Sequence, residues 1–272
     1  MANSLGNFTP LTAARRFLLL LRQFGPVQTL AVCAAMLDDQ YIRAFDRRYG
    51  VQTSGHVELS QTSFDPARLK DATAYGPVNA WGIRKLFKAL NLPTSLAFVD
   101  LGSGMGRACI LAHEYGFVRV TGVELAPELC RVARQNVMNR RRLASGRTPI
   151  NIIEGDVLEY CDSATDDVFF MFRAFSLDFL RTVLDKLAVR SVSQKKSLTV
   201  IYTERLSWPP SECVTALAYH AAFQEVYQTT SWGQSFFVFR CGMQPALQAA
   251  QTSPAATSMS LSETARRAQQ QA

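Results

Sequence analysis

The segment VDLGSGMGRA, residues 99–108, places three glycines at alternate positions directly after a short apolar run. Such a run, ending in a glycine turn before a helical pattern, is typical of a buried strand that feeds a helix in a parallel sheet. Gly102 supplies a tight turn, Gly104 lets backbone amides approach a ligand, and Gly106 lets the helix start close to the strand. A nicotinamide site reads G-x-G-x-x-G, and Arg107 replaces its third glycine, so the turn does not fit a pyrophosphate.

Acidic residues stand at the ends of three successive predicted strands. Asp100 precedes the glycine turn, where a carboxylate would repel a pyrophosphate and attract a ligand with a positive amino group. Glu124 lies 22 residues after Gly102, a position from which an acid accepts hydrogen bonds from both ribose hydroxyls of a nucleoside. Asp156 stands at the end of the third strand, within reach of an adenine amino group. Because ligands of open parallel sheets bind at the carboxyl ends of the strands, we expect these acids to line one rim.

Strand-like and helical patterns alternate along the middle of the chain. Strands are predicted at 95–101, 118–125, 150–156, 167–172 and 197–203, and helices at 80–92, 106–116, 126–143, 176–189 and 211–223. Two further strand-like runs, 223–232 and 234–241, flank Gly233 and predict an antiparallel hairpin. The pattern predicts an α/β fold: a doubly wound, mostly parallel seven-stranded sheet with helices on both faces and this hairpin at its C-terminal end. The segment between the third and fourth strands, CDSATDD at 161–167, is predicted to be a polar loop.

Composition divides the chain into three parts. Residues 70–242 are predicted to form the sheet domain, and residues 1–69 an N-terminal helical or lid segment. Residues 243–272 are rich in Ala, Gln, Ser and Thr and predict a disordered tail. Residues 11–24 carry arginines and no acid, which is compatible with a transit peptide or with a helix that contacts a membrane surface. We favour an amphipathic helix that packs on the domain.

The overall composition is that of a soluble globular protein, with 48% hydrophobic and 19% charged residues. The net charge of +7 is spread along the chain, so charge alone does not favour nucleic acid as a partner. The six cysteines form no C-x-x-C pair and the three histidines show no metal-ligand spacing, so no metal site is predicted. Buried thiols of this kind favour a cytoplasmic location. The alternative is a location in an organelle or at a membrane surface, to which the basic N-terminal helix would direct the chain.

Three motifs resemble, in order and spacing, the first three motifs of class I S-adenosylmethionine-dependent methyltransferases. They are FVDLGSGMGRACILA at 98–112, VTGVELAPELC at 120–130 and IIEGDV at 152–157. AYGPV at 74–78 is similar to the loop that closes over the cofactor in relatives, including Dot1-type protein lysine methyltransferases. FDRRYGVQTSGHVEL at 45–59 resembles the lead-in of small bacterial members. The resemblance implies the Rossmann-like fold of that class and S-adenosylmethionine as the cofactor.

The resemblance also implies roles for residues of this chain. Asp100 would serve the methionine amino group through the glycine loop, Glu124 would hold the ribose, and Asp156 with Val157 would frame the adenine. The implied cofactor-binding residues are Tyr75, Asp100, Gly102, Ser103, Gly104, Gly106, Glu124, Asp156 and Val157.

The chain departs from the family after the fourth strand. Many methyltransferases carry an Asn-Pro-Pro-Tyr or Asn-Pro-Phe type segment there, which faces the acceptor. FFMFRAFS at 169–176 has Arg173 and Ala174 in place of Asn and Pro and retains only Phe175. Arginine donates hydrogen bonds but cannot take a proton from a nucleophile, so no catalytic base is predicted. Arg173 and Phe175 remain candidates for the substrate side of the site.

The predicted activity is methyl transfer from S-adenosylmethionine to an oxygen or nitrogen acceptor of unknown identity, on a protein or a small molecule, with protein lysine as one possibility. The altered segment 169–176 motivates an alternative, a regulatory or scaffold protein that binds the cofactor without transferring the methyl group. A nicotinamide oxidoreductase is disfavoured by the glycine spacing.

Overall fold

The computed structural model describes residues 18, 21–22, 40–58, 71, 73–143, 149–206 and 210–242. The chain divides into two compact units, Met1–Phe45 and Asp46–Ala272, and the whole sheet lies in the second. The predicted tail at 243–272 and most of the predicted segment 1–69, including most of 11–24, lie outside the described residues, so the three-part division stays a prediction. Within the described ranges, no helix is long and apolar enough to cross a membrane.

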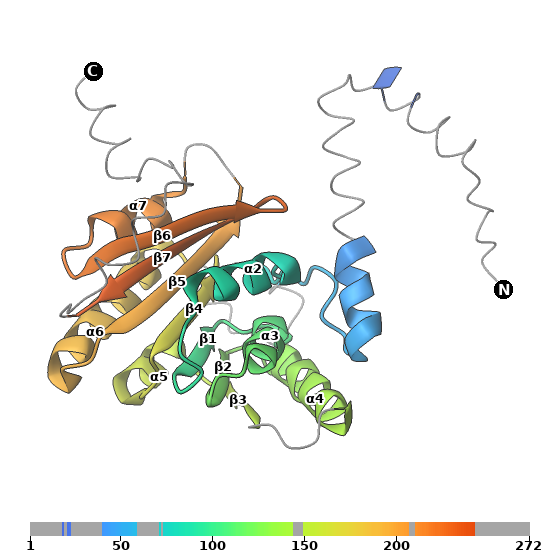
Figure 1. Ribbon diagram of the computed structural model, residues 1–272, viewed down its shortest axis with the longest axis horizontal. Coiled ribbons are helices and arrows are strands. Elements are labelled where there is room, and N and C mark those ends of the chain that lie inside the picture. Colours follow the sequence, from blue (N-terminus) through green and yellow to red (C-terminus); the bar gives the residue numbers. More distant parts are fainter. Residues whose placement is uncertain are drawn as a thin grey trace. The chain divides into compact units, whose positions relative to one another are not determined.

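A seven-stranded sheet forms the centre of the second unit, in the order β3-β2-β1-β4-β5-β7-β6 (Figure 1). The strands are β1 Ala97–Leu101, β2 Arg119–Glu124, β3 Ile150–Glu154, β4 Val168–Phe172, β5 Leu198–Arg205, β6 Phe223–Ser231 and β7 Gln234–Cys241. The first five strands pair in parallel, whereas β7 runs antiparallel to both β5 and β6. The predicted doubly wound sheet with a C-terminal antiparallel hairpin is therefore confirmed.

The helices that cover the sheet are α2 Ala80–Leu90, α3 Arg107–Tyr115, α4 Pro127–Leu143, α5 Val157–Ser163, α6 Leu177–Gln194 and α7 Glu212–Tyr219. The prediction of a polar loop at 161–167 was wrong in part, because α5 extends to Ser163. Asp156 caps this helix by accepting a hydrogen bond from the backbone N–H of Leu158. Seven residues are too few for an apolar period to be recognised, so the Asp cap was the available signal.

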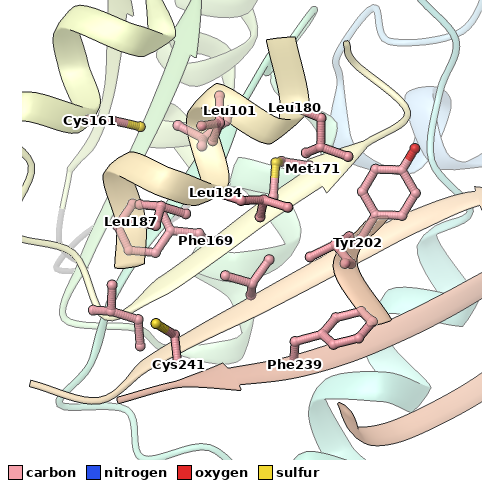
Figure 2. Packing of buried hydrophobic residues seen from close by; sticks show 14 of the residues in the cluster. Leu101, Cys161, Phe169, Met171, Leu180, Leu184, Leu187, Tyr202, Phe239 and Cys241 are labelled. Atoms are coloured by element: carbon pink, nitrogen blue, oxygen red, sulfur yellow. The ribbon is translucent and has the colours of Figure 1, made fainter. Parts of the chain in front are cut away.

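One face of the sheet carries an apolar layer beneath α5, α6 and α7. Leu180, Leu184 and Leu187 recur at helical spacing along α6 and are fully buried. They pack on side chains from β4, β5 and β7, among them Phe169, Met171, Tyr202 and Phe239 (Figure 2). Burying each Leu or Phe contributes roughly 1.5–3 kcal/mol relative to exposure, so this layer holds α6 on the sheet.

Aromatic side chains fill the opposite face, beneath α2 and α3. The ring of Phe98 from β1 lies 5.9 Å from that of Phe87 on α2 and 5.4 Å from that of Phe117. Side chains alternate along a strand, and Leu101 of β1 belongs to the layer under α6. Asp100 shares the parity of Phe98, so its carboxylate points to the face that α3 covers.

Candidate cofactor site

The carboxyl ends of β1, β2 and β3 lie side by side at one edge of the sheet. Leu101 is opposite Val123, and Glu124 is opposite Glu154. A cavity of about 290 Å³ lies at this edge. Most of the predicted site residues line it: Tyr75, Asp100, Gly102, Ser103, Gly104, Glu124, Asp156, Val157 and Phe175. The structure therefore brings the three strand-end acids, the glycine loop and the AYGPV segment together in one cavity.

Gly106, also predicted as a cofactor residue, is not part of the cavity lining. It precedes α3 with a φ of +82°, and a Cβ added there would lie 3.4 Å from the side chain of Ala133 on α4. That distance is an ordinary van der Waals contact, so glycine is favoured here by the left-handed backbone and not by lack of space. The cofactor role of Gly106 stays a prediction.

Tyr75 packs directly on the glycine loop. A Cβ added to Gly104 would lie 2.2 Å from Cδ2 of the Tyr75 ring, so only glycine fits beneath that ring. The Tyr75 hydroxyl donates to the carbonyl of Thr53 at 2.8 Å, and its backbone N–H donates to the carbonyl of Val57 at 2.9 Å. Burial raises the pKa of Tyr75 well above its usual range, so the phenol stays protonated at neutral pH. Tyr75 is thus a fixed wall of the cavity and not a base.

Glu124 holds the glycine loop in place. Its Oε2 accepts a hydrogen bond from the backbone N–H of Gly104 at 2.8 Å, and its Oε1 accepts from the N–H of Ala126 at 2.9 Å. Burial raises the pKa of this carboxyl, and these backbone donors counteract the shift. Each carboxylate oxygen has two lone pairs, so both oxygens retain capacity to accept from a ligand hydroxyl. The ribose contact expected for Glu124 stays a prediction.

Asp100 and Ser103 are buried polar groups with few partners. Asp100 is 3% exposed, and burial together with the charge of Glu124 raises its pKa to about 8. Among the described residues, the polar contact of its carboxylate is with the Cys109 thiol, 3.9 Å away. The Ser103 hydroxyl is buried with no hydrogen-bond partner in the described part of the chain. Such groups fit a ligand that brings donors of its own, as a cationic amino group does.

Asp156 and Val157 follow β3 at the start of α5. The Asp156 carboxylate lines the cavity with one oxygen, Oδ1, 2.7 Å from the backbone N–H of Leu158. Val157 is buried and presents an apolar surface beside it. An acceptor next to an apolar side chain suits an adenine ring, whose exocyclic amine donates and whose faces are apolar.

The far end of the cavity is aromatic. Phe170, Phe172 and Phe179 line it together with Phe175, whose ring lies 4.9 Å from that of Phe179. Arg173 is not part of the lining: it is exposed, with a φ of +42°, and its backbone N–H donates to the carbonyl of Thr203 at 3.0 Å. Of the two substrate-side candidates, Phe175 therefore lies in the cavity and Arg173 lies outside it.

Several lining residues were not predicted from the sequence. Phe170 lies two residues before Phe172 on β4, and Phe179 lies four residues after Phe175, so the periods of strand and helix could have indicated Phe170 and Phe179. Arg107 could have been noticed as a basic residue at a helix start, where the macrodipole disfavours it. Asp71 also lines the cavity, and no local pattern marks it.

Residues 67–147 match the model of a protein family described as histone methylation protein DOT1. The resemblance to Dot1-type methyltransferases is confirmed over this segment. It covers the AYGPV loop, the glycine loop and Glu124, and amounts to less than a third of the 272-residue chain. No curated protein matches the chain.

Several solved structures of methyltransferases are similar to this chain. Magnesium protoporphyrin IX methyltransferase from Synechocystis, solved with S-adenosylmethionine bound, is 14% identical, with a TM-score of 0.47 over 60% of this chain and 78% of that one. An RNA methyltransferase from Salinibacter ruber, in complex with S-adenosylhomocysteine, is 18% identical, with a TM-score of 0.44 over 63% and 97% of the two chains. A ribosomal protein L11 methylase from Lactobacillus delbrueckii is 18% identical, with a TM-score of 0.44 over 59% and 77%.

Proposed function

We propose that the protein is an S-adenosylmethionine-dependent methyltransferase. The observation that carries the proposal is the buried carboxylate of Asp100, which shares one cavity with the glycine loop and with Glu124 and Asp156. The match of residues 67–147 to a family of methylation proteins supports it independently. A scaffold of this class supports many functions, so the proposal rests on the site and not on the sheet.

The residues of the cavity divide between the parts of the cofactor. The positive charge of the methionine ammonium would favour the ionised form of Asp100, whose carboxylate would accept hydrogen bonds from it. The Ser103 hydroxyl would donate to the same end of the ligand. The free lone pairs of Glu124 would accept from the ribose hydroxyls. Asp156 would accept from the adenine amine while Val157 covers one face of the ring. Of these groups, Asp100, Ser103 and Glu124 are buried and Asp156 is half-buried.

When bound, S-adenosylmethionine supplies an electrophilic methyl group. The chain must then align an acceptor with that group and exclude water, and such alignment can supply roughly 7–11 kcal/mol of the barrier reduction. The aromatic end of the cavity serves both tasks, since Phe172, Phe175 and Phe179 form an apolar wall beside the proposed transfer site. The raised pKa of Tyr75 excludes its phenol as a proton acceptor at neutral pH.

For the acceptor we propose a nitrogen on an alkyl stem, such as a protein lysine. The phenylalanine wall would pack on the stem, and the Asp71 carboxylate in the lining would attract the cationic head group. The ammonium would release one proton to solvent, and the lone pair of the neutral amine would then attack the methyl group as its bond to sulfur breaks. Asp71 is held at this end because its carbonyl accepts a hydrogen bond from the backbone N–H of Ser176 at 3.0 Å.

A second candidate is a cofactor-binding protein that does not transfer the methyl group. Arg173 and Ala174 replace the Asn-Pro pair expected beside the acceptor, and the Arg173 side chain lies outside the cavity lining. Incubating the purified full chain with radiolabelled S-adenosylmethionine and fractionated cell extract separates the two candidates. Transfer of label to protein supports the lysine proposal, and label in small molecules corrects the acceptor. Cofactor binding without any transfer supports the second candidate.

A further inference from the structure

Arg107 occupies an unfavourable place for a cation. It is the first residue of α3, where the positive end of the macrodipole repels a positive side chain. It is also only 2% exposed, so its charge must be compensated inside the protein. A buried arginine at the start of a helix is stable only where neighbouring residues supply a carboxylate and further hydrogen-bond acceptors.

A short segment before the sheet supplies those partners. The Nη2 of Arg107 donates to Oδ1 of Asp46 at 3.2 Å, and its Nε donates to the hydroxyl of Thr53 at 2.7 Å. The other oxygen of Asp46 accepts from the backbone N–H groups of Thr53 at 2.7 Å and Ser54 at 2.6 Å. Although burial opposes it, these hydrogen bonds lower the pKa of Asp46, so its carboxylate is charged. We call residues 46–54 the lead-in segment.

The lead-in segment is tied to the glycine loop at two further points. The Thr53 carbonyl accepts the hydrogen bond of the Tyr75 hydroxyl, and the Tyr75 ring covers Gly104. On the other side, the amide of Asn136 donates to the carbonyls of both Gln52 and Met105, at 2.8 and 2.9 Å. The position of Thr53 therefore determines the position of the Tyr75 ring, which lines the cavity beside the glycine loop.

We propose that Arg107 is a positioning residue. Its buried ion pair with Asp46 holds the lead-in segment in place, and Thr53 of that segment holds the Tyr75 ring in the binding geometry before the cofactor binds. This inference rests on the proposed function of the cavity. Arg107 itself lines the cavity, whereas Asp46 does not. A wall formed in advance lowers the ordering cost of binding, so loss of the ion pair through Asp46 should weaken binding although Asp46 is not part of the lining. Arg107 thus acts through Tyr75.

The test uses the full chain and two readouts, hydrogen exchange of the Thr53 and Ser54 amides and calorimetric titration with S-adenosylhomocysteine. In Arg107→Lys and Asp46→Asn, we expect the Thr53 and Ser54 amides to exchange at least tenfold faster without ligand. The dissociation constant for S-adenosylhomocysteine should rise at least tenfold. Saturating S-adenosylhomocysteine should restore the protection of both amides. The matched control is Arg190→Lys, which alters another buried arginine, bonded to the Asp166 carbonyl away from the cavity. It should lower thermal stability and leave both readouts within twofold.

Tyr75→Phe keeps the proposal testable if the ion-pair variants do not fold, because it removes only the hydroxyl that bonds Thr53. It should raise the dissociation constant severalfold and lower the melting temperature by no more than about 4 °C, since one hydrogen bond contributes about 1 kcal/mol. An unchanged dissociation constant overturns the positioning role. If the ion-pair variants bind S-adenosylhomocysteine weakly but their Thr53 and Ser54 amides exchange at the wild-type rate, Arg107 contacts the ligand directly. That result also overturns the positioning role. Variants that bind as tightly as wild type overturn the positioning role alone, whereas a wild-type chain that does not bind overturns the proposed function as well.

Discussion

Glu124 Oε2 accepts a hydrogen bond from the backbone N–H of Gly104 over 2.8 Å, which joins the end of β2 to the loop after β1. The acid that the family resemblance assigns to the ribose therefore also shapes the loop assigned to the methionine end. Two parts of one ligand site share a residue, so a change at Glu124 is expected to affect both stability and binding.

Replacing Glu124 by alanine removes the acceptor for two buried backbone N–H groups. Leaving a buried donor without a partner costs about 1–3 kcal/mol, and loss of the repulsion between Glu124 and Asp100 offsets part of this cost. Glu124→Ala should therefore lower the free energy of unfolding by about 2 kcal/mol. Denaturant unfolding measures the loss. Glu154→Ala is the matched control, because Glu154 ends the neighbouring strand but is exposed and paired with Arg134 at the surface. It should cost less than about 1 kcal/mol, and equal losses would contradict the loop-holding role.

Gly104→Ala should displace the Tyr75 ring, since the new Cβ would lie 2.2 Å from Cδ2 of that ring. Alanine at this positive φ costs about 1–2 kcal/mol in any protein. Gly233→Ala carries the same backbone cost, with φ +71° and no atom of the described residues within 4 Å of its Cβ. We expect the dissociation constant for S-adenosylhomocysteine to rise at least tenfold in Gly104→Ala only, as measured by calorimetry. If Gly104→Ala and Gly233→Ala raise the dissociation constant equally, the contact with Tyr75 is not the cause.

Asp156 has two separable tasks, the cap of α5 and the proposed contact with adenine. Serine retains the capping hydrogen bond to Leu158 but lacks the second carboxylate oxygen that a ligand amine could use. Asp156→Ser should therefore keep the melting temperature within about 2 °C, because cap exchanges among Ser, Asp and Asn change stability little. The dissociation constant for S-adenosylhomocysteine should rise about fivefold or more, since a hydrogen bond contributes about 1 kcal/mol. Unchanged affinity would show that the residue is only a cap.

Asp100 makes the folded chain less stable as the pH rises. Its pKa is about 8 in the folded protein and near 3.9 in an unfolded chain. Both states are protonated below about pH 4, so the group costs nothing there. The cost grows between these pKa values and is complete above about pH 8. Asp100→Asn should therefore raise the melting temperature by roughly 4 °C or more at pH 8 and by little at pH 4. A melting temperature that falls at pH 8 contradicts this account.

The rim of the site was predictable because its residues stand at strand ends. Strands end where an apolar run meets a glycine or an acid, and parallel strands bring those ends to one edge. Asp100, Glu124 and Asp156 could be assigned to one cavity on this basis, and the cavity lining contains all three.

The contacts between these residues and the preceding segment could not be predicted. Arg107 and Asp46 are separated by 61 positions, and Tyr75 reaches Thr53 across 22. Such pairs depend on how the lead-in segment folds over the glycine loop, and the hydrophobic repeat of the sequence does not predict this. The direction of the Arg173 side chain was equally hidden, because it follows from a left-handed backbone at the end of β4. Sequence pattern thus located the acids, while packing determined their partners.

The central claim is that the cavity binds S-adenosylmethionine through the carboxylate of Asp100, and titration of the full chain with S-adenosylhomocysteine tests it most directly. The account predicts saturable binding at one site per chain in wild type, and a dissociation constant at least a hundredfold higher in Asp100→Asn. The melting measurement described above checks that this variant is folded. No binding by the wild-type chain, or equal binding by Asp100→Asn, would contradict it.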